Sequence, residues 1–105
     1  MNFDGTEGSE INLNEAAALT KNYRSQNPDG IKGIFFGKEK ILSLLNEEHS
    51  VGVRIYFGLD EDDSQKLVLV GVDENKNDLT EGVIVDVGII CPPQCGVQNR
   101  LNADF

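Results

Sequence analysis

Basic side chains are scarce in this chain, which has 9 Lys and Arg residues against 18 Asp and Glu residues and a net charge of −9. Proteins that bind the phosphate backbone of nucleic acids need a positive patch, and an anionic membrane surface attracts the same charge. We therefore expect no nucleic-acid partner and no binding to an anionic membrane. The acidic excess by itself is typical of a soluble protein.

Long apolar runs are absent, and none approaches the roughly 20 residues that a membrane-spanning helix needs. The longest candidate is the segment Gly82–Cys91, which Asp86 interrupts. The opening residues, MNFDGTEGSE, are polar and acidic, unlike a secretory signal peptide. We expect no membrane insertion and a cytoplasmic location, with export by another route left open.

Histidine is limited to a single residue, His49, beside the end of an expected helix. No Ser or Cys stands at a spacing that would pair with it as a nucleophile. The glycines at positions 30, 33 and 37 do not match the spacing of a Rossmann or phosphate-binding loop. The sequence indicates no catalytic residues and no cofactor, and it favours a non-enzymatic role.

Cysteine is scarce as well, with two residues, Cys91 and Cys95, in the segment CPPQC. A dithiol redox site typically uses Cys-x-x-Cys beside a strand–helix unit, and a structural zinc site needs about four ligands. Neither pattern is present. Three interpretations stay open for the pair: reduced thiols, which a cytoplasmic protein has by default, a disulfide within or between chains, and a metal or redox role.

Oxygen-bearing side chains alternate from Asp73 to Asp78, as they do in calcium-binding loops. The full motif also needs Gly at its sixth position and Glu at its twelfth, where this chain has Asp78 and Ile84. Asn and Asp are also the ordinary residues of tight turns. The sequence therefore predicts a turn and no metal site, and the run Asp60–Asp63 is likewise expected to be a solvated hairpin loop.

The clearest structural signal is a pair of strands joined by this acidic loop. In VGVRIYFGLD, the residues Val53, Ile55 and Phe57 alternate with Arg54 and Tyr56, which is the pattern of a half-buried strand. The following KLVLVGV is apolar on both faces, which is typical of a central strand that is buried on both sides. These two segments predict a hairpin at the centre of the fold.

Length and hydrophobic periodicity predict an α+β fold, with two short helices packed on a small, mainly antiparallel sheet of three to four strands. We expect, in chain order, a helix capped by Asn12 or Asn14 and ending near residue 26, a strand at 31–36, a helix at 38–48, and strands at 51–58, 66–72 and 83–87. Residues 1–10 are expected to be a flexible tail, 11–90 the domain, and 91–105 a tail that contains Cys and Pro.

Several segments follow one another in a distinctive order: NYR at 22–24, FGKEKILSLLN at 36–46, VGVRIYFGLD, KLVLVGVDENKNDL, CPPQC and a closing NRLN. In this order they resemble a group of small uncharacterised proteins of Bacteroidetes bacteria, from about Asn22 to Asn102. The resemblance implies a bacterial source, a self-contained domain and a CPPQC tail that recurs in the group. It implies no activity, ligand or site residue.

The functional hypothesis that follows is a non-enzymatic protein-interaction or self-assembly domain, with a homo-oligomer or another protein as partner. Arg54 and Tyr56 are the candidate interface residues, because they share a strand face and both residue types are enriched at interfaces. One alternative is a small-ligand binder or enzyme that uses this Arg54 and Tyr56 face. Another is a thiol-based metal or redox role at Cys91 and Cys95.

Overall fold

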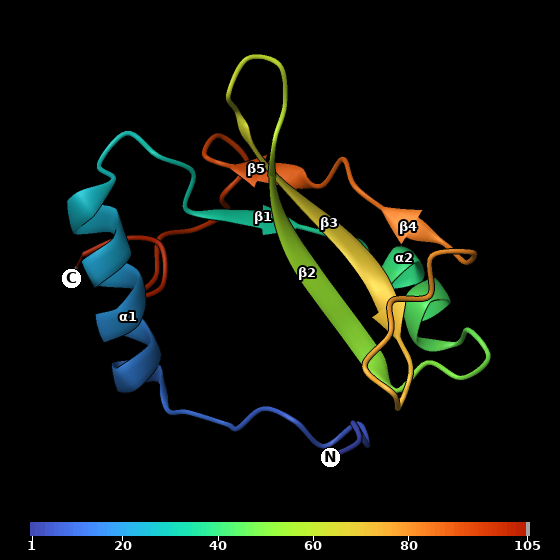
Figure 1. Cartoon of the computed structure of the whole chain (residues 1–105). Helices are drawn as coiled ribbons and strands as arrows, with labels where there is room; N and C mark the ends of the chain where they lie inside the picture. Colours follow the sequence, from blue (N-terminus) through green and yellow to red (C-terminus); the bar gives the residue numbers. More distant parts are fainter. Residues whose placement is uncertain (105) are drawn as a thin grey trace. The chain divides into compact units, whose positions relative to one another are not determined.

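The computed structural model describes residues 1–104 and has two helices and five strands. In chain order these are α1 (Leu13–Gln26), β1 (Gly33–Phe35), α2 (Lys38–Leu45), β2 (Gly52–Leu59), β3 (Gln65–Val72), β4 (Ile84–Val85) and β5 (Ile89–Cys91) (Figure 1). The strands form two antiparallel sheets, one with the order β2–β3–β4 and one with the pair β1–β5. The α+β class expected from the sequence is confirmed, and its strands are divided between two sheets.

The chain consists of two compact units, each made of two separate stretches of sequence. The hairpin unit comprises residues 1–8 and 36–88, and the α1 unit comprises residues 9–35 and the chain from Ile89 onward. The domain boundaries expected after residues 10 and 90 stay a prediction, because a division by contacts says nothing about which part folds on its own.

The hairpin β2–β3 is the largest paired element of the hairpin unit. Its register places Arg54 opposite Val70 and Ile55 opposite Leu69, so the side chains of each pair project from the same face. β4 pairs with the other edge of β3, which makes β3 the central strand, as the sequence predicted. Leu69, Val70 and Val72 are buried.

Leu67 and Val68 of β3 are only half-buried, although they were expected to be as buried as their neighbours. The cause is the length of β4, which has two residues and pairs only with Leu69 and Val70. The start of β3 therefore extends past the end of its second neighbour strand.

The core of the hairpin unit lies between α2 and one face of the β2–β3–β4 sheet. Leu44 of α2 is completely buried, and it forms a cluster with Leu69 and Val85. Partly buried apolar side chains complete this cluster, namely Phe36, Ile41, Val53 and Leu67. Burial of apolar surface of this kind is the main stabilising term in a small domain.

The end of α2 is fixed to the segment before β4 by a carboxylate. Glu47 accepts a hydrogen bond from the backbone N–H of Val83, at 2.6 Å from Oε1. Glycine at position 82 permits this approach, because a Cβ there would lie 2.5 Å from a Glu47 carboxylate oxygen and the Glu47 side chain would have to shift. The acidic residue beyond the helix end is therefore bound to a donor.

In the α1 unit, the N-terminus of α1 is capped by Asn12, whose Oδ1 lies 2.8 Å from the backbone N–H of Glu15. This confirms one of the two caps expected from the sequence. The C-terminal segment is bound to α1 by Arg24, which donates to the carbonyl of Leu101 at 2.8 Å and to the Asp104 carboxylate at 2.7 Å. The ion pair lowers the pKa of Asp104 below its ordinary value.

Candidate functional site

The first candidate site is a polar cluster on the face of β2 that carries Arg54 and Tyr56. Val53, the residue between Gly52 and Arg54, packs into the core beneath α2. Because side chains alternate along a strand, Arg54 and Tyr56 project from the opposite face of the sheet. Arg54 and Tyr56 therefore share one face of the strand, as the alternation in the sequence predicted.

Both side chains bind one carboxylate, that of Asp78 in the loop after β3. Arg54 Nη1 donates to Asp78 Oδ1 at 2.6 Å and to the carbonyl of Lys76 at 3.2 Å. The hydroxyl of Tyr56 donates to the other carboxylate oxygen of Asp78. Sequence reasoning did not find this third member, because the path of the loop decides which of its acidic residues reaches β2.

The electrostatics of the cluster are those of a satisfied ion pair. Hydrogen bonds from Tyr56 and then Arg54 lower the pKa of Asp78 below its ordinary value, although desolvation opposes the shift. The same carboxylate raises the pKa of Arg54. The side chains of Arg54 and Asp78 are 33% and 22% exposed, so water still reaches the pair. Nη1 of Arg54 is therefore already engaged, and an incoming anion would compete with Asp78 for the charge of the guanidinium.

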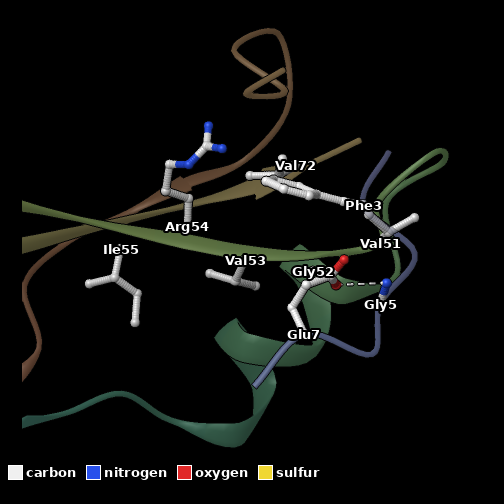
Figure 2. A pocket seen from close by; sticks show the side chains of 9 residues that line it. All are labelled: Phe3, Gly5, Glu7, Val51, Gly52, Val53, Arg54, Ile55 and Val72. Carbon is white, nitrogen blue, oxygen red and sulfur yellow. Dashed lines mark hydrogen bonds between the residues drawn. The ribbon is translucent and has the colours of Figure 1, made fainter. Parts of the chain in front are cut away.

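The N-terminal segment adds an aromatic ring to this cluster. Figure 2 shows Phe3 and Arg54 on one side of β2, with Val53 and Ile55 on the other. The cationic groups of Arg54 and Lys76 each lie 5.9 Å from the centroid of the Phe3 ring, within the range of cation–π interactions. The backbone N–H of Phe3 donates to the carbonyl of Glu74 at 2.9 Å. The expected N-terminal tail thus has a defined contact at its start.

The second candidate site is a groove of about 470 Å³ between this N-terminal segment and the start of β2 (Figure 2). Its lining residues are Phe3, Gly5, Glu7, Val51, Gly52, Val53, Arg54, Ile55 and Val72. Gly5 has a φ of +93°, and a Cβ there would lie 3.1 Å from the carbonyl oxygen of Val51. Glu7 closes the turn by accepting hydrogen bonds from the N–H groups of Asp4 and Gly5, both at 3.0 Å.

Beyond the groove, the second half of β2 presents three apolar side chains to solvent. Ile55 is 51% exposed, Phe57 82% and Leu59 69%. The alternation in the sequence indicated a face packed on the core, and only its first part is packed. The physical reason is length: the eight residues of α2 span about 12 Å, whereas the eight residues of β2 span about 27 Å.

The same strand is an edge of its sheet, because the order is β2–β3–β4 and no strand described within residues 1–104 pairs with its outer side. The backbone groups on such an edge are a template for pairing with another strand. β2 ends at an acidic hairpin tip, Asp60–Asp63 (Figure 1). Asp60 shapes the tip by accepting hydrogen bonds from the N–H groups of Asp62 and Ser64, at 2.9 and 3.0 Å.

The loop that resembles a calcium site is built as a turn. Asp73 Oδ1 accepts hydrogen bonds from the N–H groups of Asn75 and Asn77, both at 2.9 Å, while Asp78 binds Arg54 and Tyr56. Across residues 1–104, no group of three or more His, Cys, Asp or Glu side chains is placed to hold a metal ion.

Cys91 and Cys95 form a disulfide, with their Cα atoms 4.8 Å apart. The default expectation of reduced thiols is therefore corrected in favour of the second interpretation. Turn hydrogen bonds bring the two residues together: Gln94 N–H donates to the carbonyl of Ile90, and Cys95 N–H to that of Pro93, both at 3.1 Å. Disulfides persist in oxidising compartments, so this bond gives the expected cytoplasmic location no support, and that location stays a prediction.

Within residues 1–104, no helix is both long and apolar enough to span a membrane. Comparison of the chain with family models, with curated proteins and with solved structures gives no match. The resemblance to bacterial proteins noted in the sequence stays a prediction. The class that the fold and site define is an α+β protein with an edge strand whose second half exposes apolar side chains.

Proposed function

We propose that this chain is a non-enzymatic protein-interaction domain whose docking element is the outer edge of β2. The observation that carries the proposal is the joint exposure of Ile55, Phe57 and Leu59 on a strand that is also a sheet edge. A partner strand that pairs with this edge would satisfy the backbone groups of β2 and cover its apolar side chains together. Addition of an extended strand is a recurring mode of peptide recognition.

The edge of β2 lacks the features by which edge strands usually avoid pairing. Natural edges are protected by proline, outward charges, bulges or very short strands. β2 has eight residues and no proline, and its one charged residue, Arg54, is bound to Asp78. β4, the opposite edge of this sheet, has two residues and gives a partner strand little to pair with. β2 is therefore the edge that suits a partner.

The interface predicted from the sequence, Arg54 and Tyr56, lies on the other face of the same strand. Both side chains already bind Asp78, which makes the apolar face the better contact surface. Tyr56 remains 45% exposed, and a partner that wraps the edge of β2 would contact it as well. The alternatives are less well supported, because Arg54 has a carboxylate partner and both thiols are consumed in the disulfide.

The binding of library peptides with apolar residues at alternate positions to the purified chain tests this function. We expect selected peptides to bind the wild type and to lose binding to Phe57→Lys, because Phe57 is at the centre of the exposed stripe. Leu19→Lys is the matched control, since Leu19 is also apolar and 62% exposed but lies in α1. The proposal fails if no peptide binds and the chain stays monomeric, or if Phe57→Lys binds the peptides as well as the wild type does.

A further inference from the structure

The charge of this protein is concentrated in the unit that carries β2. The hairpin unit has 14 of the 18 acidic residues and 5 of the 9 basic ones, which gives it a net charge of −9. The α1 unit has the remaining 4 acidic and 4 basic residues, and its net charge is zero. A partner at the edge of β2 therefore binds the unit that carries the net negative charge of the molecule.

We propose, building on the function above, that the occupant of the β2 edge is an extended basic segment of another protein, in which Lys or Arg residues precede an alternating apolar run. Three features select it. The middle of the edge is apolar, from Ile55 to Leu59. The end of β2 is acidic at the tip Asp60–Asp63, and the whole unit that carries the strand has a net charge of −9.

The acidic tip presents its charges next to the end of the apolar stripe. Glu61, Asp62 and Asp63 are all exposed, whereas Asp60 is engaged in the turn. Lys66 is the neighbouring cation, and it is paired with Gly58, so it projects from the face that carries Arg54 and Tyr56. The apolar stripe of β2 is thus followed along the chain by three exposed carboxylates.

The direction of the partner follows from the location of this tip. Antiparallel pairs are more frequent and slightly more stable than parallel ones. A partner antiparallel to β2 places its N-terminal end beside the tip, so its basic residues come before its apolar residues. Its C-terminal end then reaches the groove at the start of β2, which one acidic and one basic residue, Glu7 and Arg54, both line.

A second copy of the chain fits this edge poorly. Two β2 strands paired about a two-fold axis would bring together two units of net charge −9. In that arrangement the acidic tip of each copy meets the start of β2 in the other, which is the end that Glu7 flanks. Like charges placed opposite one another across strands are destabilising. Charge complementarity favours a basic foreign strand over self-association.

Four peptides with one shared apolar alternation test the inference by calorimetry on the full chain. They carry three Lys, three Ser or three Glu at the N-terminal end, or three Lys at the C-terminal end. We expect the N-terminal Lys peptide to bind about tenfold more tightly than the Ser peptide, as several exposed ion pairs together predict. The Glu peptide should bind most weakly, and high salt should reduce all these differences.

A triple variant, Glu61→Gln with Asp62→Asn and Asp63→Asn, should abolish the advantage of the Lys peptide and leave the Ser peptide unchanged. It spares Asp60, which the turn needs. The matched control neutralises Glu39, Glu81 and Asp86, three exposed acids of the same unit that lie outside β2 and its tip, and it should preserve the advantage.

The outcomes separate this inference from the function on which it rests. Equal binding of the Lys and Ser peptides overturns the basic partner and leaves strand addition intact. Tighter binding of the C-terminal Lys peptide overturns the direction. Light scattering that shows a dimer, lost in Phe57→Lys, makes the occupant a second copy. If no peptide binds and no dimer forms, the proposed function itself is wrong.

Discussion

At the scale of single residues, one carboxylate organises the outer face of β2. Asp78 accepts hydrogen bonds from both Arg54 and Tyr56, and the Phe3 ring lies near the same guanidinium. The sequence predicted that Arg54 and Tyr56 share a face, because parity along a strand is a local property. It did not predict Asp78, because only the folded loop brings residues 54 and 78 together.

Replacing Asp78 tests this arrangement through the pH dependence of stability. The folded-state pKa of Asp78 is lowered, so its ionised form stabilises the fold above the ordinary Asp value of about 3.9. That stabilisation is lost as the pH falls through the lowered folded value. We expect Asp78→Asn to be less stable than the wild type at pH 7 and the difference to shrink steadily below about pH 4.

Urea unfolding at a series of pH values measures this difference. Tyr56→Phe is the companion variant, since it removes one of the two hydrogen bonds to Asp78 and keeps Arg54. Its loss of stability should be smaller than that of Asp78→Asn. A difference between wild type and Asp78→Asn that stays constant from pH 7 to pH 2 would contradict the lowered pKa.

The core makes a second prediction at this scale. Leu69 is 2% exposed in the central strand, and Leu69→Ala should lower the free energy of unfolding by roughly 2–5 kcal/mol, because it removes buried methyl groups and leaves a cavity. Phe57→Ala, at an exposed site, should change it by less than about 0.5 kcal/mol. Chemical denaturation of both variants compares the two sites, and equal losses would show that Phe57 is buried in solution.

At the scale of elements, a short helix and a long strand explain the candidate site. α2 covers the start of β2, and the rest of the apolar face stays open because the strand is about twice as long. Alternation in the sequence shows which residues share a face, but it does not show how far a neighbouring helix reaches. The pairing of β1 with β5 also had no local signal, because its partners are distant in the chain.

At the C-terminal end of β5, the Cys91–Cys95 disulfide allows a further prediction. Replacing Cys91 and Cys95 with Ser should leave the helices and sheets in place and lower the free energy of unfolding by about 2 kcal/mol, the chain-entropy value for so short a loop. Circular dichroism and urea unfolding of the variant measure both effects. A thiol assay on the native protein should detect no free thiol, and two reactive thiols would contradict the disulfide.

At the scale of the whole molecule, the uneven distribution of charge matters most. The sequence shows a net charge of −9, from which we expect no nucleic-acid partner, but it does not show that one unit carries all of this net charge. The units are interleaved along the chain, so their charges separate only after folding. An acidic unit with an apolar edge strand is suited to a basic, extended partner.

Amide hydrogen exchange of the full chain, with and without the peptide that carries N-terminal Lys residues, tests the central claim most directly. A strand added to the edge of β2 gives hydrogen-bond acceptors to the outward N–H groups of that strand. We predict slower exchange within Ile55–Leu59 on peptide binding, with the amides of β4 and α1 unchanged. Bound peptide that leaves exchange in β2 unaltered, or that protects another surface, would contradict the account.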